Sequence, residues 1–556
     1  MTRPPQRTAG LCVPLLCVAM LLAPPPAAAA DVAAAEPFTL IEADVRAVSE
    51  AFAEGILDPG GLIEVYLARI EAFDRGGPEL HTLITFDAGA PERTAAGEHA
   101  GTAAGALAGI PIVIKDNIDV VGFPTTGGSA ALRGHEPFYD AAVLARIRAA
   151  GGIPIAKANL SEMELPYGRF GYSSAGGQSR NPYRPQRDPF SSAVPAAVAA
   201  NLAMLGVGTD TLGELRGAAS ASGVVGIRPT LGLVSRAGIV PTALSLDTPG
   251  PVARTVRDAA LLLGVMAGPD ESDPRTLESA AHRQEDYVRF LDDTALDGAR
   301  IGIPDGLYGG HHDVDAAFRD AERTLEARGA EVVRISLPED LAGDLAARLD
   351  RIVETEPRDQ LGAYLLNTEE GMPHSLADLV RMSESPLIAG SATPVHPARL
   401  AAYRRMLHSL GLADLTYLEE ISRALPALRA RIVALLDDEG LDALALPTLL
   451  CPAGSLLDAY DSTYDCAVDD PQRPAYLASA AGLPEITLPM GFTGHGLPIG
   501  LSLLGPPWSE TRLIALAYDF EQATRVRRPP ESAPALPDMP AAGGAELAEE
   551  TAREGE

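Results

Sequence analysis

The sequence predicts an α/β protein built on a large mixed, mostly parallel sheet that helices cover on both faces. Short apolar runs that are typical of buried strands alternate with segments of helical periodicity along most of the chain. One stretch has the order of a complete βαβ unit, with apolar runs at 301–303 and 332–335 on either side of a helical segment at 316–327. The chain has 556 residues, 46% of them hydrophobic, which is enough to bury a large core.

The predicted elements begin with two helices and end with an amphipathic one. Helical periodicity spans 41–73 and breaks at Asp58-Pro-Gly-Gly, because glycine and proline interrupt helices. Thr255 is predicted to cap a helix that runs to about Met266. The region 340–435 is mostly helical and has the weakest pattern. The other predicted elements are strands at 83–86, 110–114, 153–156, 224–228, 233–234, 444–446 and 486–488, and helices at 141–149, 196–204 and 512–524.

Residues 1–30 have the pattern of a secretory signal peptide. Arg3 and Arg7 supply the positive charge of its first part. The apolar run at 11–22 is too short to span a bilayer, and the alanines at 28–30 offer a cleavage site. We therefore expect a secreted or periplasmic protein.

The charge and composition of the remaining chain limit its partners and predict a tail. We expect one domain at 31–530 and a disordered acidic tail at 531–556, which is rich in proline, alanine and glutamate. The net charge of −31 argues against nucleic acid and, once the signal peptide is removed, against a membrane as partners. A small-molecule amide-like or cationic ligand is the expected partner, while the oligomeric state cannot be derived from the sequence.

Two cysteines remain after removal of the signal peptide, Cys451 and Cys466. In an oxidising compartment they could form a disulfide across a short loop. Two unpaired thiols are an equally good interpretation of the sequence, so both alternatives stay open.

Many motifs of the chain, in the right order, resemble those of the amidase signature family. The matching segments are Gly109-Ile-Pro-Ile-Val-Ile-Lys-Asp-Asn117, Asn181-Pro-Tyr183, Gly208-Thr-Asp-Thr-Leu-Gly-Glu-Leu-Arg216, Val225-Gly-Ile-Arg-Pro-Thr230, Thr248-Pro-Gly-Pro-Val-Ala-Arg-Thr255, Ala481-Gly-Leu-Pro484 and Gly496-Leu-Pro-Ile-Gly-Leu501. The resemblance covers nearly all of the chain after the signal peptide. It implies one large mixed sheet with helices on both faces. It also implies a catalytic triad of a serine, a second serine in a cis peptide, and a lysine.

The lysine of that triad is matched by Lys115. The chain contains only two lysines, Lys115 and Lys157, beside 42 arginines. A position that stays lysine in such a chain indicates a need for a compact amine that can lose its proton, which a guanidinium group cannot do. We interpret Lys115 as the catalytic base, with a purely structural ammonium as the alternative, and Lys157 as structural.

The glycine-rich loop that carries the second serine is replaced. The helix starting at 196–200 fixes the alignment and places the loop at 188–194, so that Phe190 falls on the cis-serine position and Ser191 follows it. A slip of one residue would place Ser191 at that position instead. Without the loop glycines, which permit positive φ, the backbone cannot keep the family's path. We expect a trans bond before Phe190, because a cis bond there costs about 2.5–4 kcal/mol.

The nucleophilic serine of the family is matched by Glu214. Backbone N–H groups of this turn should form an oxyanion hole, but Leu212 stands where the family has glycine and puts the donor geometry in doubt. We expect Asp210 and Arg216 to keep the turn in shape. The residues expected to line the substrate site are Phe190, Asp210, Thr211, Leu212, Gly213 and Arg216.

Three interpretations of Glu214 follow from its carboxylate. It could form a buried ion pair with Lys115, act with Lys115 as an acid–base couple in non-hydrolytic chemistry, or bind a cationic ligand group. We find no motif for a cofactor, so none is expected. His311 and His312 stand next to Asp313, but no further ligand group is apparent in the sequence around them, and we expect no metal there.

The leading hypothesis is a secreted amidase-family protein that has lost the serine mechanism. It would act as a ligand-binding pseudoenzyme or as a catalyst repurposed around Lys115 and Glu214. The alternative is an active amide hydrolase that uses a displaced serine, Ser191 or Ser192, with Lys115.

Overall fold

The computed structural model describes residues 38–97, 105–164, 170–337, 345–456 and 464–536. All of these described residues belong to one structural unit. The predicted signal peptide and residues 537–556 of the predicted tail lie outside the described residues. Among the helices that the structure does describe, each is too short or too polar to cross a bilayer.

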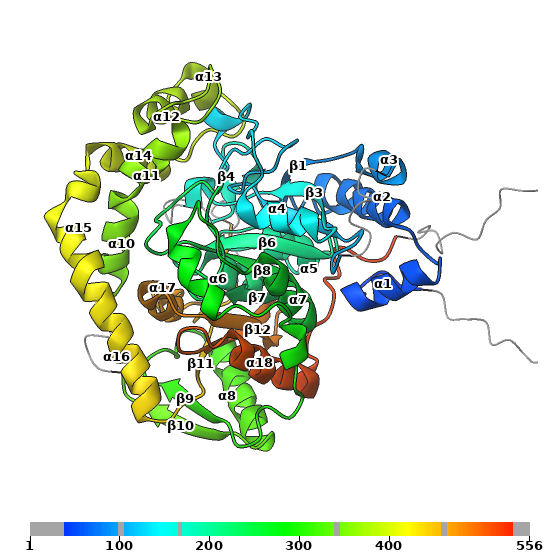
Figure 1. The fold of residues 1–556 in the computed structure, drawn as a ribbon, viewed down its shortest axis with the longest axis vertical. Helices are drawn as coiled ribbons and strands as arrows, with labels where there is room; N and C mark the ends of the chain where they lie inside the picture. Colours follow the sequence, from blue (N-terminus) through cyan, green and yellow to red (C-terminus); the bar gives the residue numbers. More distant parts are fainter. Residues whose placement is uncertain (1–37, 98–104, 165–169, 338–344, 457–463, 537–556) are drawn as a thin grey trace, which may run out of the picture. The chain divides into compact units, whose positions relative to one another are not determined.

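A mixed sheet of eleven strands forms the centre of the described part of the chain (Figure 1). Its order is β1-β3-β2-β6-β8-β7-β12-β13-β11-β9-β10. The strands are β1 (Leu83–Phe86), β2 (Pro111–Lys115), β3 (Ile153–Ala158), β6 (Leu205–Asp210), β7 (Val225–Arg228), β8 (Thr248–Ala253), β9 (Arg300–Pro304), β10 (Glu331–Ile335), β11 (Ala443–Pro447), β12 (Glu485–Phe492) and β13 (Pro498–Leu504). Beside this sheet, β4 (Tyr172–Ser173) and β5 (Gly177–Gln178) form a small hairpin.

Parallel pairing occurs in two groups of three strands. The strands β3, β2 and β6 are parallel neighbours, and so are β11, β9 and β10. Antiparallel pairs connect the two groups through β8, β7, β12 and β13. The predicted α/β class, with a large mixed sheet covered by helices on both faces, is confirmed.

The helices that cover the sheet were mostly predictable from periodicity and caps. Thr255 caps α7 as predicted, because its side chain accepts a hydrogen bond from the Asp258 N–H. The region predicted as helical at 340–435 contains the helices α10 to α16. The helices are α1 (Val45–Ala53), α2 (Pro59–Arg69), α3 (Ala90–Ala95), α4 (Ala142–Ala149), α5 (Val194–Ala199), α6 (Glu214–Ser222), α7 (Val256–Met266), α8 (His312–Ala327), α10 (Leu345–Thr355), α11 (Pro357–Leu365), α12 (Leu376–Ser383), α13 (Pro386–Ala389), α14 (Pro397–His408), α15 (Leu415–Glu419), α16 (Leu425–Asp438), α17 (Tyr476–Ala481) and α18 (Glu510–Thr524).

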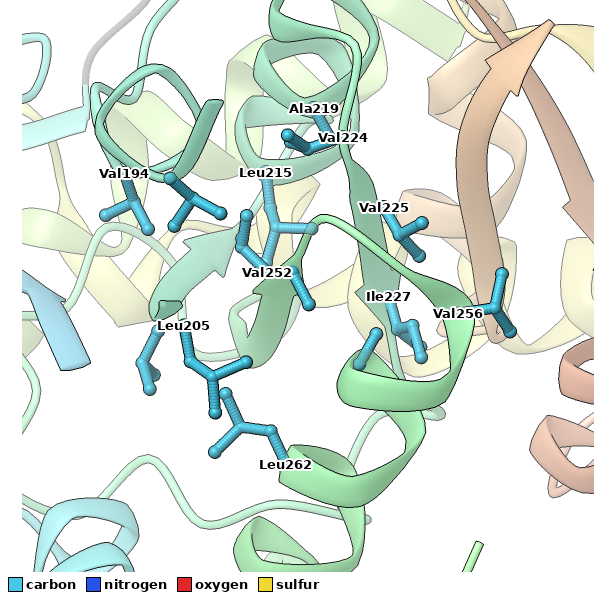
Figure 2. Packing of buried hydrophobic residues seen from close by; sticks show 14 of the residues in the cluster. Val194, Leu205, Leu215, Ala219, Val224, Val225, Ile227, Val252, Val256 and Leu262 are labelled. Atoms are coloured by element: carbon cyan, nitrogen blue, oxygen red, sulfur yellow. The ribbon is translucent and has the colours of Figure 1, made fainter. Parts of the chain in front are cut away.

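Apolar side chains between β6, β7, β8 and the helices α5, α6 and α7 form the core beneath the site (Figure 2). Leu205 of β6, Leu215 of α6 and Val252 of β8 are fully buried there. Burying a side chain of this size stabilises the fold by about 1.5–3 kcal/mol. The core therefore fixes β6 and α6 relative to each other, and with them the turn that joins the two elements.

Two predicted boundaries are wrong. The helix expected at 196–204 ends at Ala199, because Asn201 takes a left-handed conformation (φ 53°) and the chain turns into β6. Residues 533 and 534, which the predicted tail includes, are docked on α2, since the Arg69 guanidinium donates to the carbonyls of Ala533 and Pro534 at 2.8 and 2.7 Å. The predicted strand at 233–234 is reduced to an isolated bridge.

Candidate functional site

The candidate site lies where three neighbouring parallel strands end. Lys115 is the last residue of β2, the segment after β3 leads to Glu164, and the turn after β6 leads to Glu214. The carboxyl ends of parallel strands share one edge of a sheet, which is where open α/β sheets bind their ligands. Sheet topology therefore brings together three charged residues that are far apart in sequence.

Lys115 is fully buried and held by three hydrogen bonds. Its Nζ donates to Glu164 Oε2 at 2.6 Å, and to Oγ1 and the carbonyl of Thr209 at 2.9 and 3.1 Å. The first of the three interpretations of Glu214, an ion pair with Lys115, is wrong, because the carboxylate that pairs with Lys115 in the described part of the chain is that of Glu164.

Sequence reasoning missed Glu164. Met163 and Glu164 both have left-handed backbone conformations, with φ of 54° and 55°, and this turn lies beside the Lys115 amine. Burial raises the pKa of Glu164 to about 8; the Lys115 charge lowers it and the Glu214 charge raises it further. Its Oε1 is buried without a hydrogen-bond partner among the described residues. The position of Glu164 shortly after a parallel strand was the signal that could have identified it.

Glu214 folds back onto the turn that precedes it. Its Oε2 accepts hydrogen bonds from the backbone N–H groups of Thr211 and Leu212, at 2.6 and 2.8 Å. Backbone N–H groups of this turn are expected to form an oxyanion hole, and two of them converge on one oxygen even though Leu212 stands where the family has glycine. Gly213 has φ 120°, and a Cβ there would lie 2.7 Å from the Ala475 Cβ, so the turn requires glycine.

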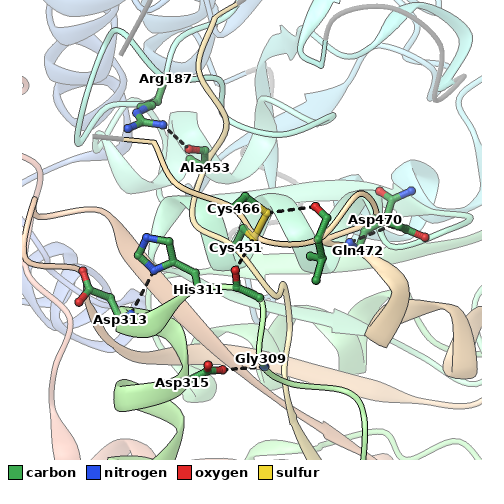
Figure 3. Close-up of a disulfide and its surroundings, with 12 residues drawn as sticks. Arg187, Gly309, His311, Asp313, Asp315, Cys451, Ala453, Cys466, Asp470 and Gln472 are labelled. Carbon is green, nitrogen blue, oxygen red and sulfur yellow. Dashed lines mark hydrogen bonds between the residues drawn. A yellow bond between two sulfur atoms is a disulfide. The ribbon is translucent and has the colours of Figure 1, made fainter. Parts of the chain in front are cut away.

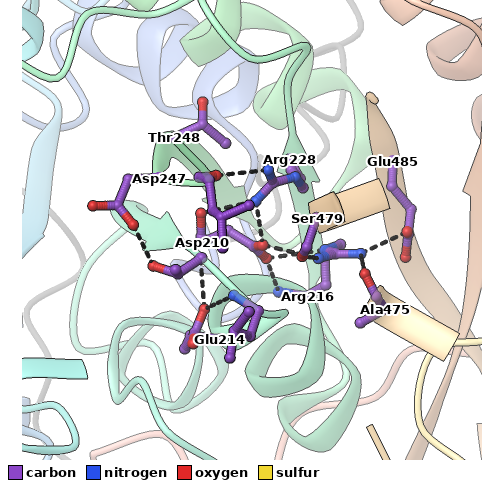
Figure 4. Close-up of polar contacts among 12 residues, drawn as sticks. Asp210, Glu214, Arg216, Arg228, Asp247, Thr248, Ala475, Ser479 and Glu485 are labelled. Carbon is purple, nitrogen blue, oxygen red and sulfur yellow. Dashed lines mark hydrogen bonds and ion pairs between the residues drawn. The ribbon is translucent and has the colours of Figure 1, made fainter. Parts of the chain in front are cut away.

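A buried network of ion pairs supports this turn (Figure 4). Arg216 binds Asp210 at 2.9 Å and Glu485 at 2.6 Å, and Arg228 binds Asp210 at 2.7 Å. Burial raises the pKa of Asp210, but the two guanidinium groups more than offset it, so its pKa lies below the ordinary value. These contacts agree with the prediction that Asp210 and Arg216 maintain the shape of the turn. Burial and the Asp210 charge raise the pKa of Glu214.

The loop that carries the candidate serines runs beside the segment after β3. Ser161 N–H donates to the Ser191 carbonyl at 2.7 Å, and Ser192 forms a bridge with Leu160. The hydroxyls of Ser191 and Ser192 are buried, and neither has a hydrogen-bond partner in the ranges that the structure describes. An unsatisfied buried hydroxyl costs about 1–3 kcal/mol and calls for an explanation, of which catalysis is one.

Phe190 has the trans bond that was predicted, and its side chain points into a small apolar cluster. Its φ is 67°, which is strained for a side chain of this size. The ring stacks on Phe170, with centroids 4.8 Å apart, and covers Gly217 of α6. A Cβ at Gly217 would lie 2.6 Å from the ring, so this glycine permits the close approach. Phe190 therefore anchors the loop to α6.

A disulfide between Cys451 and Cys466 closes the segment on which this loop rests (Figure 3). The Asp188 N–H donates to the carbonyl of Gly454 at 3.0 Å. Arg187 forms a bridge with the same segment and donates to the Ala453 carbonyl at 3.3 Å. Of the two alternatives that the sequence left open, the structure has the disulfide.

The space beside the site is small in this structure. The cavity lined by Thr209, Thr211 and Asp247 measures about 10 Å³, which is room for about one water molecule. Thr211 Oγ1 donates to Asp247 Oδ1 at 2.6 Å.

Lys157 and His311, which the sequence analysis considered, stabilise local structure. Lys157, on the strand next to Lys115, donates to Thr125 Oγ1 at 3.0 Å and pairs with Asp116 at 3.4 Å. His311 caps α8 by accepting a hydrogen bond from the Asp313 N–H. Within the described ranges, no group of three or more histidine, cysteine, aspartate or glutamate side chains is arranged to hold a metal ion.

Comparison with known proteins identifies the family. The family model described as Amidase matches residues 61–514. A glutamyl-tRNA(Gln) amidotransferase subunit of Syntrophobacter fumaroxidans is 35% identical over 83% of this chain and 88% of its own length. The native peptide amidase of Stenotrophomonas maltophilia superposes with a TM-score of 0.78 and 36% identity, covering 89% of this chain and 99% of that one. An amidase family protein from Bacillus anthracis superposes with a TM-score of 0.77 and 28% identity, covering 88% of this chain and 93% of that one.

These relatives contradict the hypothesis of lost activity. Proteins named as a peptide amidase and as part of an amidotransferase are similar to the chain over most of its length. They favour the alternative, an active amide hydrolase, over a pseudoenzyme or a repurposed catalyst. The chain belongs to the amidase family.

Proposed function

We propose that the protein hydrolyses the C–N bond of a small-molecule amide. The observation that carries this proposal is the buried Lys115 amine, which lies next to a turn whose N–H groups converge on one oxygen. Both parts serve amide hydrolysis, because a base must take a proton from the nucleophile and an oxyanion must be stabilised. The family to which the chain belongs supports the same reaction.

The turn supplies the oxyanion hole in this proposal. The N–H groups of Thr211 and Leu212 would bind the developing oxyanion once the Glu214 carboxylate leaves them. The raised pKa of Glu214 favours this exchange, since a protonated carboxyl binds N–H donors less strongly than a carboxylate does. Removing one donor from such a hole typically lowers the rate by about 10²–10³-fold.

Ser191 and Ser192 are the candidate nucleophiles. Both hydroxyls are buried and lack a partner among the described residues, on a loop that runs beside the segment leading to Glu164. Lys115 would accept the serine proton. Glu164 has a pKa of about 8 and shares a hydrogen bond with Lys115, so near neutral pH its carboxyl can hold the proton that leaves the amine neutral.

We further propose that the protein is exported. The signal-like residues 1–30 support this, and so does the disulfide Cys451–Cys466, since such bonds persist mainly in oxidising compartments. Mass spectrometry of protein recovered from each cell fraction would test this. We expect a mature form that starts near Asp31, outside the cytoplasm, and full-length protein confined to the cytoplasm would contradict export.

The test of the proposed activity is ammonia or amine release from a panel of small amides. We expect turnover by the native protein and a loss of about 10²–10⁴-fold in Lys115→Met, the range that general acid–base catalysis contributes. Lys157→Met is the matched control, because it removes an equally buried amine from the neighbouring strand. An equal loss per folded molecule in both variants would contradict a catalytic role for Lys115.

A further inference from the structure

A second cavity, of about 520 Å³, lies beyond the small cavity of the candidate site. It is lined by segments that are far apart in sequence, including the start of α16 and the end of α17. The two cavities share Arg236 and Leu244 as a wall. A volume of this size is typical of small-molecule sites.

Three arginines line this cavity: Arg236, Arg275 and Arg429. The described part of the chain supplies no acidic side chain to the lining. This is unusual for the protein as a whole, which has 75 acidic residues and 44 basic ones. The local charge is therefore opposite to the net charge of the chain.

The three arginines differ in their partners. Arg236 is held by Asp273, through its Nε at 2.8 Å, and by the Leu244 carbonyl. The guanidinium groups of Arg275 and Arg429 make no hydrogen bond or ion pair with any residue that the structure describes. Burial and the neighbouring Arg275 lower the pKa of Arg429, while Glu278 raises it. Arg275 is exposed and Arg429 is half-buried, so the guanidinium groups of both residues are open to a ligand in this cavity.

Most of the remaining wall is apolar. Leu231, Ile421, Leu425 and Ala480 line the cavity around the arginines. Guanidinium groups bind planar carboxylates through two parallel hydrogen bonds, and an apolar wall favours a ligand that has a hydrocarbon part. The lining therefore combines an anion-binding end with a hydrophobic surface.

We propose that this cavity binds a small organic acid, with the carboxylate between Arg275 and Arg429 and the hydrocarbon part against the leucines. The bound carboxylate is then the negatively charged partner of the Arg275 and Arg429 guanidinium groups. This cavity adjoins the candidate active site, but binding of an organic acid in it does not require that the protein hydrolyse amides.

The probe is 4-phenylbutyrate, and titration calorimetry of the purified full-length protein measures its binding. The comparison ligands are 4-phenylbutanol, which lacks the charge, and inorganic phosphate, which lacks the hydrocarbon part. We expect 4-phenylbutyrate to bind with a Kd in the millimolar range or tighter, and more weakly as salt is added. Absence of binding in that range, equal binding of the alcohol, or tighter binding of phosphate would overturn the proposal.

Three variants locate the site. Arg275→Gln and Arg429→Gln should each weaken binding about tenfold or more, since each removes a charge-assisted hydrogen bond. Arg423→Gln is the control, because it removes the same charge from an exposed ion pair with Glu419 just before α16. An equal effect of the control would overturn the proposal. The thermal midpoint of either pocket variant should stay unchanged or rise, because a repulsion is relieved, and this shows that weaker binding is not caused by misfolding.

Discussion

The turn at 210–216 and the loop at 187–195 border the same candidate site, yet they are stabilised in different ways. The turn is held by buried ion pairs, and the groups that it would contribute to the proposed reaction are backbone N–H donors. The loop is held by packing of Phe190, by a disulfide-closed neighbour and by the buried carboxyl of Asp188. The N–H donors of the turn belong to the backbone, so they remain when a side chain is substituted. The hydroxyls of the loop belong to serine side chains, so they are lost when those serines are replaced.

The largest expected effect concerns the ion pairs of the turn. Arg216→Met leaves the buried Glu485 carboxylate without its guanidinium partner and leaves Asp210 paired with Arg228 alone, and it should lower the free energy of unfolding by about 3–5 kcal/mol. Urea unfolding measures this change. Arg323→Gln, which breaks an exposed pair with Asp320, is the control and should have little effect. A similarly small effect of Arg216→Met would contradict the role given to the network.

The contributions of the loop and of the turn to the stability of the fold should also depend on pH in different ways. Burial raises the pKa of Asp188 from 3.8 to about 7, although the Phe190 N–H and Arg187 lower it. Between those values the folded state retains a proton that the unfolded state has lost, so Asp188 makes stability fall as pH rises from about 4 to 7. Asp210 has a lowered pKa, so its stabilising contribution is lost only on strong acidification.

Thermal unfolding between pH 5 and 8 tests this difference. Asp188→Asn keeps an oxygen that can accept the Phe190 N–H, and it should reduce the fall in midpoint temperature on the way to pH 8. Other buried carboxyls with raised pKa values, such as Asp247 and Asp258, will still contribute to the fall. A profile of Asp188→Asn that is parallel to that of the native protein would refute the assignment.

The disulfide should support the loop more than the turn. Replacing Cys451 and Cys466 by serine opens a loop whose ends are 15 residues apart. The unfolded chain then gains conformational entropy, which should lower the free energy of unfolding by about 3 kcal/mol. Amide hydrogen exchange should increase at Asp188, whose N–H donates to Gly454, and remain slow at Thr211. Equal acceleration at both amides would mean that the two regions are not supported separately.

The strain at Phe190 gives the smallest expected effect. Phe190→Ala and Phe190→Gly both lose the packing against Phe170, but only glycine adopts φ 67° without strain. The glycine variant should therefore be more stable than the alanine variant by about 1 kcal/mol. Chemical denaturation compares the two directly. If alanine were the more stable replacement, the left-handed conformation would not be a source of strain.

Regular elements and family motifs were predictable from the sequence, while long-range partners were not. Apolar runs located β2 and β3, Thr255 located the start of α7, and family motifs located Lys115. Glu164 was missed because its role depends on two consecutive left-handed residues and on sheet order, neither of which has a periodic signal. The docking of residues 533–534 on Arg69 was missed for a similar reason, since composition does not reveal a partner far away in sequence.

We propose that the chain is an active amide hydrolase whose nucleophilic serine lies on the loop at 187–195. Labelling with a fluorophosphonate probe, followed by peptide mass spectrometry, tests it most directly. We predict one label per molecule, at Ser191 or Ser192, and its loss in Lys115→Met but not in Lys157→Met. A native protein that releases ammonia without any labelled serine, or with the label elsewhere, would contradict the account.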